Sequence, residues 1–426
     1  MRNVCGWGAV LVLVWSSMSW STEDVPLQAT GAPDMELQLS STYKRLKAPE
    51  TGRLTVQLTD GEGFTYPLYF FIPSITRDGK YLIYHRAAHR EVQLYRLNFA
   101  TGQSKQLTHA ECPDTQWRPW CVDSGRGVLD HRSVLNVARN LVIYFDGNDV
   151  HAVDVETLED KLLFVIPEGR EAYGQNCCTP DGKWLVYIHT PHGSIWGEPC
   201  KGAAVVAYNF DTKEQRTLCH IDSAIFHVTA YDNEHFIVTP PADHAGMLLT
   251  DMNSGWIKLL RTGDPGVRGH LIHCHVTSRG ISYEVPEVQL SGLYDPLTRR
   301  RFEFQFPKNF QYIHTGRDPQ GRLWFYENSS GWDKFDVHDI HALVRLDRQE
   351  GDQWLRLTGT WPTFGGGQKA HFHPQLTPDR KWILMTGGDT TTHTNHIFLL
   401  DASDLKDSKG ISTELLSATG ANDLVR

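Results

Sequence analysis

The sequence predicts an all-β protein with the architecture of a seven-bladed β-propeller. Short runs rich in Tyr, Val, Ile and Leu alternate with Gly, Asn and Asp turns, which is typical of strands joined by hairpins. This pattern recurs at intervals of roughly 40 to 60 residues, as propeller blades do. Helical periodicity is nearly absent from the 426 residues. We therefore expect small antiparallel sheets arranged in a ring.

Two segments show the repeated unit most clearly. One begins at the turn 76–80 and runs to Thr108, and the other begins at the turn 179–183 and runs to Leu218. Both turns contain Asp-Gly-Lys, and Asp-Gly supplies the positive φ angles that tight hairpins require. Each unit is predicted to be one blade.

Weaker copies of the unit bring the number of blades to seven. A strand at 53–58 is expected to close the ring against the last blade. A β-sandwich is the alternative for many short strands, but repeats of one unit fit a propeller better. The weaker copies centre on residues 139–140, 233–234, 279–280, 320–321 and 379–380.

The N-terminus predicts export. Residues 1–21 are typical of a secretory signal peptide, with Arg2 before an apolar run that ends in small residues. The run is too short to span a membrane, and we expect no membrane insertion after cleavage. A polar segment at 22–52 then precedes the propeller domain at 53–426. We predict a periplasmic or secreted protein.

Charge and cysteine content narrow the class further. A net charge of -9 without basic runs argues against nucleic-acid binding. Removal of the signal peptide leaves an odd number of cysteines, so at least one thiol is expected to be unpaired. Cys112 with Cys121 is the first expected disulfide, and Cys177 or Cys178 with Cys200 is the second.

The repeat places several histidines on the innermost strands. Counting seven residues back from the turn glycine of two successive blades gives His273 and His314, and the next blade carries His371 and His373. Innermost strands line the central channel, so these four imidazoles are expected to converge at one mouth of the ring. His227 occupies the same place in the preceding blade.

The densest cluster of potential metal ligands is Gln368-x-x-His371-x-His373. Alternate side chains of a strand share a face, so the two imidazoles are expected to point the same way. Gln368 reaches that side if the chain bends before the strand. Together they would supply most of a first coordination shell. The alternative is ordinary strand histidines held by hydrogen bonds.

Nearly the whole chain after residue 50 resembles the oligogalacturonate lyases, propeller-fold lyases that degrade pectin. This resemblance implies a divalent ion, Mn²⁺, as cofactor and an acidic oligosaccharide as substrate. It rests on the segments 69–80, 153–159 and 172–174, and on the Gln368, His371 and His373 motif that leads to residues 377–379.

The resemblance also implies a role for each site residue. The metal ligands would be Gln368, His371, His373 and His314, and His273 would be the base that removes the sugar proton. Neutral donors leave the ion its full charge, which favours an anionic substrate over water.

The chemistry of β-elimination requires such a set. A divalent ion on the uronate carboxylate acts as a Lewis acid and increases the acidity of the C5 proton. A neutral imidazole with a pKa near ~6.5 is suited to accept that proton. Expulsion of the sugar linked at C4 then leaves a 4,5-unsaturated uronate end. Candidate substrate-binding residues are Arg268, Arg279 and Arg317, because guanidinium groups pair bidentately with carboxylates. His227 is a further candidate from its place in the preceding blade.

Alternative functions remain open at this point. The segment 242–247 lacks an arginine that the lyase family uses for substrate, which leaves room for another acidic polysaccharide such as ulvan. A non-enzymatic propeller that scaffolds or binds envelope proteins would share the turns but would need no ligand cluster. A propeller-linked peptidase would need a Gly-x-Ser-x-Gly elbow, which the sequence lacks.

Overall fold

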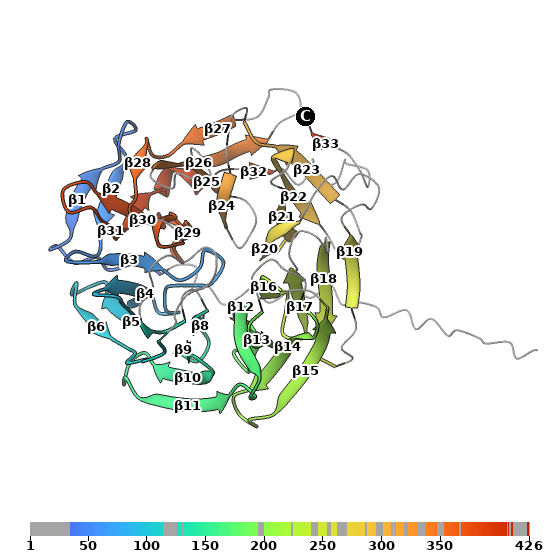
Figure 1. The fold of residues 1–426 in the computed structure, drawn as a ribbon. Coiled ribbons are helices and arrows are strands. Elements are labelled where there is room, and N and C mark those ends of the chain that lie inside the picture. Colours follow the sequence, from blue (N-terminus) through green and yellow to red (C-terminus); the bar gives the residue numbers. More distant parts are fainter. Residues whose placement is uncertain are drawn as a thin grey trace, which may run out of the picture.

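A computed structural model shows antiparallel sheets that follow one another around a central axis (Figure 1). The all-β propeller prediction is confirmed. In the ranges described, the chain forms two short 3-10 helices, η3 (Gln368–Ala370) and η4 (Ser403–Leu405), and no described helix could span a membrane. The structure describes residues 35–113, 126–129, 132–194, 200–222, 225–239, 246–253, 257–261, 271–285, 288–294, 301–307, 310, 312–318, 323–329, 337–346, 353–365, 368–406, 408, 410–411 and 424–425.

The first two sheets consist mainly of strands consecutive in the sequence. One contains β3 (Phe64–Pro67), β4 (Tyr81–Ala88), β5 (Glu91–Asn98) and β6 (Ser104–Gln106), with β7 (Arg126–Gly127) beside β5. The other contains β8 (Val134–Asn136), β9 (Leu141–Asp146), β10 (Asp149–Asp154) and β11 (Asp160–Val165).

An eight-stranded sheet follows, made of two antiparallel units. The first unit contains β12 (Arg170–Cys178), β13 (Trp184–Pro191), β14 (Ala203–Asn209) and β15 (Gln215–Ile221). The second contains β16 (His227–Ala230), β17 (His235–Thr239), β18 (Gly246–Asp251) and β19 (Ile257–Arg261). A parallel bridge between Gln175 and His227 joins β12 to β16.

The next two sheets carry much of the candidate site. One contains β20 (Ile272–Thr277), β21 (Gly280–Val285), β22 (Leu290–Tyr294) and β23 (Arg301–Gln305), with β33 (Leu424–Val425) at its edge. The other contains β24 (Tyr312–Arg317), β25 (Trp324–Ser329), β26 (Val337–Leu346) and β27 (Gln353–Arg356), and β28 (Trp361–Pro362) and β32 (Gly410–Ile411) also pair with β26.

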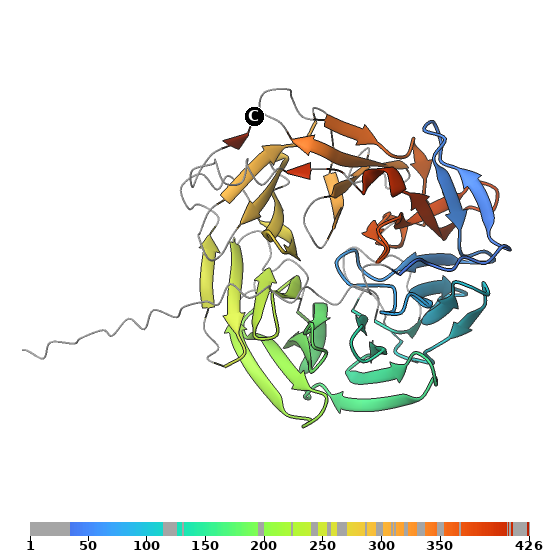
Figure 2. The ribbon, with the colours of Figure 1, turned by 180° about the vertical axis from the view of Figure 1, so that it is seen from behind.

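The last sheet closes the ring with strands from both ends of the chain (Figure 2). Val56 in β2 pairs with Leu399 in β31, which confirms the closing strand predicted at 53–58. β1 pairs with β2, so part of the expected polar segment 22–52 belongs to this sheet. Its strands are β29 (Gln375–Leu376), β30 (Trp382–Asp389), β31 (Thr394–Asp401), β2 (Leu54–Gln57) and β1 (Lys44–Lys47).

The described strands thus form six hydrogen-bonded sheets, whereas the sequence predicted seven separate blades. Apolar side chains fill the space between neighbouring sheets. Where the ring closes, Val56 and Leu399 pack in one cluster with Leu82 of the first sheet, and all three are fully buried. Burial of a side chain of this size contributes about 1.5–3 kcal/mol, so this cluster holds the two ends of the ring together.

The repeated turn has a specific hydrogen-bond pattern. The Thr76 hydroxyl donates to the Asp78 carboxylate at 2.7 Å and accepts from the Tyr81 N–H at 3.0 Å. Gly79 follows with a φ of 65°, a value that favours glycine. The turns at 179–184 and 377–382 repeat the same threonine and aspartate contacts, with Arg380 at a φ of 58° in place of the glycine in the second. The repeats in the sequence therefore correspond to one kind of turn.

The cysteines depart from expectation. Cys177, Cys178 and Cys200 are buried free thiols, so the second expected disulfide is wrong. Burial raises the pKa of Cys178 well above its usual value, and its thiol is accordingly unreactive. Cys121, the expected partner of Cys112, lies outside the described residues.

Candidate metal centre

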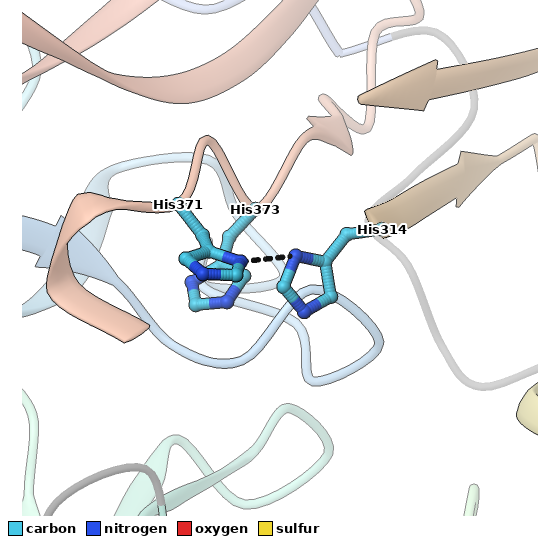
Figure 3. Close-up of side chains that lie close together, drawn as sticks. All are labelled: His314, His371 and His373. Atoms are coloured by element: carbon cyan, nitrogen blue, oxygen red, sulfur yellow. Dashed lines mark hydrogen bonds between the residues drawn. The ribbon is translucent and has the colours of Figure 1, made fainter. Parts of the chain in front are cut away.

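Three imidazoles, one from a strand and two from a segment outside the strands, meet at one point (Figure 3). His314 lies in β24, and His371 and His373 lie in the segment between η3 and β29. The ring centroid of His314 is 4.7 Å from that of His371 and 4.6 Å from that of His373. All three residues are buried. The predicted convergence of these histidines is confirmed.

The local backbone at these histidines differs from the predicted strand. Gln368 begins the 3-10 helix η3, and His373 has a φ of 44°, which is uncommon for a residue with a Cβ atom. The alternation rule for strands therefore does not apply, and the two imidazoles converge through a turn instead. The Gln368 side chain lies outside the described atoms, so its amide stays a predicted ligand.

A buried carboxylate lies behind the imidazoles. Glu327 in β25 is fully buried, and its Oε2 is 3.0 Å from the Nδ1 of His314. Its Oε1 accepts the backbone N–H of Phe372 at 3.1 Å and lies 2.8 Å from the Nδ1 of His338 in β26. One side chain thus contacts both segments that carry the three imidazoles.

Glu327 remains an anion in this environment. Burial alone would raise its pKa, but the contact with His338 and the charges of His338, His371 and His373 outweigh burial and lower the pKa to about 2. The centre therefore has a negative charge beside its imidazoles, in addition to the neutral ligands expected from the sequence.

His273, the predicted base, borders the same centre. Its ring centroid is 5.3 Å from that of His314 and 5.7 Å from that of His227. Burial, with a further contribution from His227 and an opposing one from Glu327, holds the pKa of His273 well below 6.5. The pKa of His273 is therefore lower than the unperturbed value of ~6.5 used in the argument for a histidine base. The imidazole is reliably neutral at neutral pH, but it is a weaker base than an exposed histidine.

Aromatic side chains cover the histidines. Tyr69, Phe70 and Phe71 follow β3 and form what we call the aromatic segment, which belongs to the pale-blue loop beside the imidazoles in Figure 3. The Phe70 ring centroid is 4.8 Å from that of His314 and 5.0 Å from that of His273. Tyr69 lies 5.7 Å from His314. The aromatic segment excludes water from the centre.

The predicted substrate-binding residues have different locations. Tyr69 stacks on buried His227 at 5.5 Å, which places His227 at the edge of the cluster. Arg279 lies in the turn after β20, six residues after His273, and its backbone N–H donates to the Thr277 hydroxyl at 3.2 Å. Arg268 lies outside the described residues.

Arg317 has a structural environment. Its guanidinium forms an ion pair with Glu284 of the neighbouring sheet and lies 4.1 Å from the ring centroid of Trp324. Only 1% of its side chain is exposed. This ion pair joins two sheets and leaves the guanidinium inaccessible to a substrate carboxylate.

Similarity to known proteins lies in the fold. No known family model matches the sequence, and no curated protein sequence matches it. An oligogalacturonate lyase in complex with manganese superposes with a TM-score of 0.68 at 19% identity, over 86% of this chain and 98% of that chain. The chain has the fold of the oligogalacturonate lyases.

Other solved structures agree with this fold. The oligogalacturonate lyase from Vibrio parahaemolyticus has a TM-score of 0.68 at 18% identity, over 85% of this chain and 97% of that chain. A β-propeller domain of Swd1 from Myceliophteria thermophila reaches 0.53 at 11% identity, over 81% of this chain and 99% of that chain. At these identities the likeness to the oligogalacturonate lyase fold says nothing about the site, whose chemistry rests on its residues.

The residues present on this lyase fold suit a divalent ion. His314, His371 and His373 each offer one nitrogen, and these atoms lie within 4.8 Å of one another. Nitrogen ligands on opposite sides of one ion at ~2.1 Å are ~4.2 Å apart, so small side-chain movements would bring all three into one coordination shell. The Glu327 anion behind them favours a cation at this position.

Several important residues of the centre were not found in the sequence. Glu327 is the single acidic residue of the segment 324–329, where it follows three aromatic residues. His338 lies in a segment with no recognised spacing. A carboxylate between bulky strand residues is unusual, because an unpaired buried charge is costly. That signal could have marked Glu327, but only the fold shows its partners.

Proposed function

We propose that this protein is a polysaccharide lyase that cleaves uronate-containing oligosaccharides of the oligogalacturonate type. Metal-assisted β-elimination would give 4,5-unsaturated uronate ends. The observation that carries this proposal is the convergence of His314, His371 and His373 with a neutral His273 at 5.3 Å from His314. The shared fold of two oligogalacturonate lyases supports it.

Each part of the centre has a role in this proposal. The imidazoles of His314, His371 and His373, with the Gln368 amide, would hold a divalent ion, Mn²⁺ in our proposal. Such an ion supplies Lewis acidity toward the uronate carboxylate. The neutral ring of His273 would accept the C5 proton, and the C5–H electron pair would form the C4–C5 double bond as the C4–O bond breaks. The leaving oxygen would take a proton from solvent. Because burial weakens His273 as a base, the proton acceptor depends on close positioning to the sugar.

The aromatic segment controls access in this proposal. The candidate histidines are between 0% and 9% exposed. A uronate carboxylate can therefore reach them only when Tyr69 and Phe70 move from the imidazoles. Once substrate is bound, the same rings exclude water, which strengthens the electrostatic contacts to the carboxylate.

Substrate cleavage provides the direct test. The purified protein is incubated with Mn²⁺ and oligogalacturonates, and the absorbance of unsaturated uronates is followed. An ulvan substrate forms a second arm, because the segment 242–247 has no arginine. We expect an increase with at least one uronate polymer. No increase with any of them, in a protein that has bound metal, would reject the lyase and favour a binding or scaffold protein.

A pair of variants separates the base from the ligands. His273→Ala is expected to abolish turnover and leave metal content normal. His192→Ala serves as the matched control, because the His192 side chain is 78% exposed and lies in a turn after β13. Loss of metal from His273→Ala would instead make His273 a ligand.

Two further parts of the proposal concern architecture and location. The eight-stranded sheet divides at the bridge between β12 and β16 into two antiparallel units, and counting these separately gives the seven blades that we propose. Residues 1–21, outside the described chain, are proposed to direct export to the periplasm or beyond. N-terminal sequencing of the mature protein checks this, and an intact Met1 would reject it.

A further inference from the structure

We propose that Glu327 is a positioning residue that sets the tautomer of His314 and fixes the His371–His373 segment, so that the metal centre is formed before the metal binds. The inference rests on the proposed metal-binding function. Glu327 contacts no substrate in our proposal, and each of its two carboxylate oxygens has a separate role.

The first task is selection of the His314 tautomer. A carboxylate only accepts hydrogen bonds, and Glu327 Oε2 lies 3.0 Å from the His314 Nδ1. The proton of neutral His314 must therefore be on Nδ1, which leaves the lone pair of Nε2 available to a metal. Histidine ligands commonly donate their other ring N–H to a carboxylate, and this contact fixes the ring orientation.

The same proton determines the state of His371. The Nδ1 atoms of His314 and His371 are 3.0 Å apart, a distance that requires one donor and one acceptor (Figure 3). Glu327 accepts the single Nδ1–H of His314, so a second N–H on the facing Nδ1 of His371 would be repelled by it. The proton of neutral His371 is then on Nε2.

The second task is to hold the backbone between two ligands. Phe372 lies between His371 and His373, and its N–H donates to Glu327 Oε1 at 3.1 Å. Its carbonyl accepts the N–H of Thr386 in β30 at 2.8 Å. These two hydrogen bonds fix the peptide groups next to the unusual φ of 44° at His373. A strained conformation of this kind persists only when surrounding contacts determine it.

Glu327 also provides charge. It is fully buried and lies 2.8 Å from His338 Nδ1, so the anion is held in place by hydrogen bonds on both oxygens. A buried anion without a fixed cation partner offsets part of the cost of moving a divalent ion out of water.

The test compares two buried glutamates. Glu327→Gln keeps the shape but removes the charge and replaces one acceptor oxygen by an amide donor, so it cannot accept from both His314 and Phe372. We expect the Kd for Mn²⁺, measured by calorimetry on metal-depleted protein, to rise by about 10- to 100-fold. Glu284→Gln is the matched control, since Glu284 is also fully buried and forms an ion pair with Arg317. It should lower the melting temperature and leave the Kd unchanged.

The outcomes separate this inference from the proposed function. Wild-type protein that binds no divalent ion would reject the metal centre itself. Wild-type protein that binds Mn²⁺, together with a folded Glu327→Gln variant of equal affinity, would overturn only the role of Glu327.

A second measurement remains valid if Glu327→Gln does not fold. Nitrogen-15 NMR of the histidine rings in metal-free wild-type protein reports the tautomers directly. We expect His314 to carry its proton on Nδ1 and His371 to carry its proton on Nε2. A proton on Nε2 of His314 would overturn the inference without the use of any variant.

Discussion

Two buried carboxylates in neighbouring sheets differ in what neutralises them. Glu284 in β21 pairs with Arg317, whose guanidinium lies between the rings of Trp324 and Tyr326. A guanidinium is permanently charged, so this pair is complete by itself. Glu327 in β25 contacts imidazoles, which are cationic only when they are protonated. The first region is therefore a fixed link between sheets, whereas the second still attracts a cation.

The difference shows why burial alone does not identify a functional site. Both carboxylates are fully buried and both have charged or polar partners. What distinguishes Glu327 is that its partners belong to a group of three imidazoles whose nitrogens lie within 4.8 Å of one another. A buried carboxylate whose partners are charged only when protonated indicates ligand binding better than a buried carboxylate paired with a guanidinium.

Of the changes considered, loss of an imidazole should have the largest effect, and the property that changes should be metal affinity at the Glu327 region. His371→Ala removes one of three converging nitrogens, so metal affinity should fall by more than the ~10–100-fold expected for an outer partner. Elemental analysis after dialysis measures this, and His192→Ala is the control. Retention of metal by the folded His371→Ala variant would place the ion elsewhere.

Breaking the ion pair between Glu284 and Arg317 should lower the free energy of unfolding. Arg317→Met leaves Glu284 buried without its cation, which typically costs about 3–5 kcal/mol. Urea denaturation of the metal-free protein measures the loss, and the Kd for Mn²⁺ should not change. A parallel loss of metal affinity would show that the two regions are coupled and would break the comparison.

Metal binding at the histidine cluster should raise the free energy of unfolding measurably. A ligand that binds only the folded state at about 100 times its Kd adds ~2.7 kcal/mol to the free energy of unfolding. We expect this gain for wild-type protein and for Arg317→Met, and no gain for His371→Ala. An equal gain in all three proteins would indicate that the ion binds outside the histidine cluster.

Much of the fold could be predicted because its signals are local. The Thr76 and Asp78 contacts lie within one turn, so the sequence pattern is the structure of that turn. The closing strand at 53–58 was also predicted, since the first and last blades of a propeller ring lie next to each other and a strand from one end of the chain can pair with the blade at the other end. The separation into six sheets was not, because the single bridge at Gln175 leaves no pattern in the sequence.

The candidate site was predictable only in part. Equivalent positions in successive blades brought His273 and His314 together with His371. Sequence spacing could not show that Tyr69 and Phe70, about 200 residues or more away, lie on these rings. Nor could it show Glu327 as their partner, since the contact depends on the path of a turn rather than on strand alternation.

Replacement of His227 should have the smallest effect on stability at neutral pH. Burial, with a contribution from His275, lowers the pKa of His227 to about 3. In the unfolded chain its pKa is near ~6.5, so the unfolded state binds more protons between these values. Stability from a neutral His227 is therefore complete above pH 6.5 and is lost as the pH falls toward 3.

His227→Phe should remove part of that dependence. Urea unfolding of metal-free protein at pH 7 and pH 5 should show a smaller loss on acidification for the variant than for wild type. Burial also lowers the pKa of His273, His275 and His189, and these groups contribute to the slope that remains. An unchanged slope would mean that His227 is already protonated in the folded state. The neighbouring ring of His273 would then border a cation, which would make the Glu327 region less attractive to a metal than the comparison with Glu284 implies.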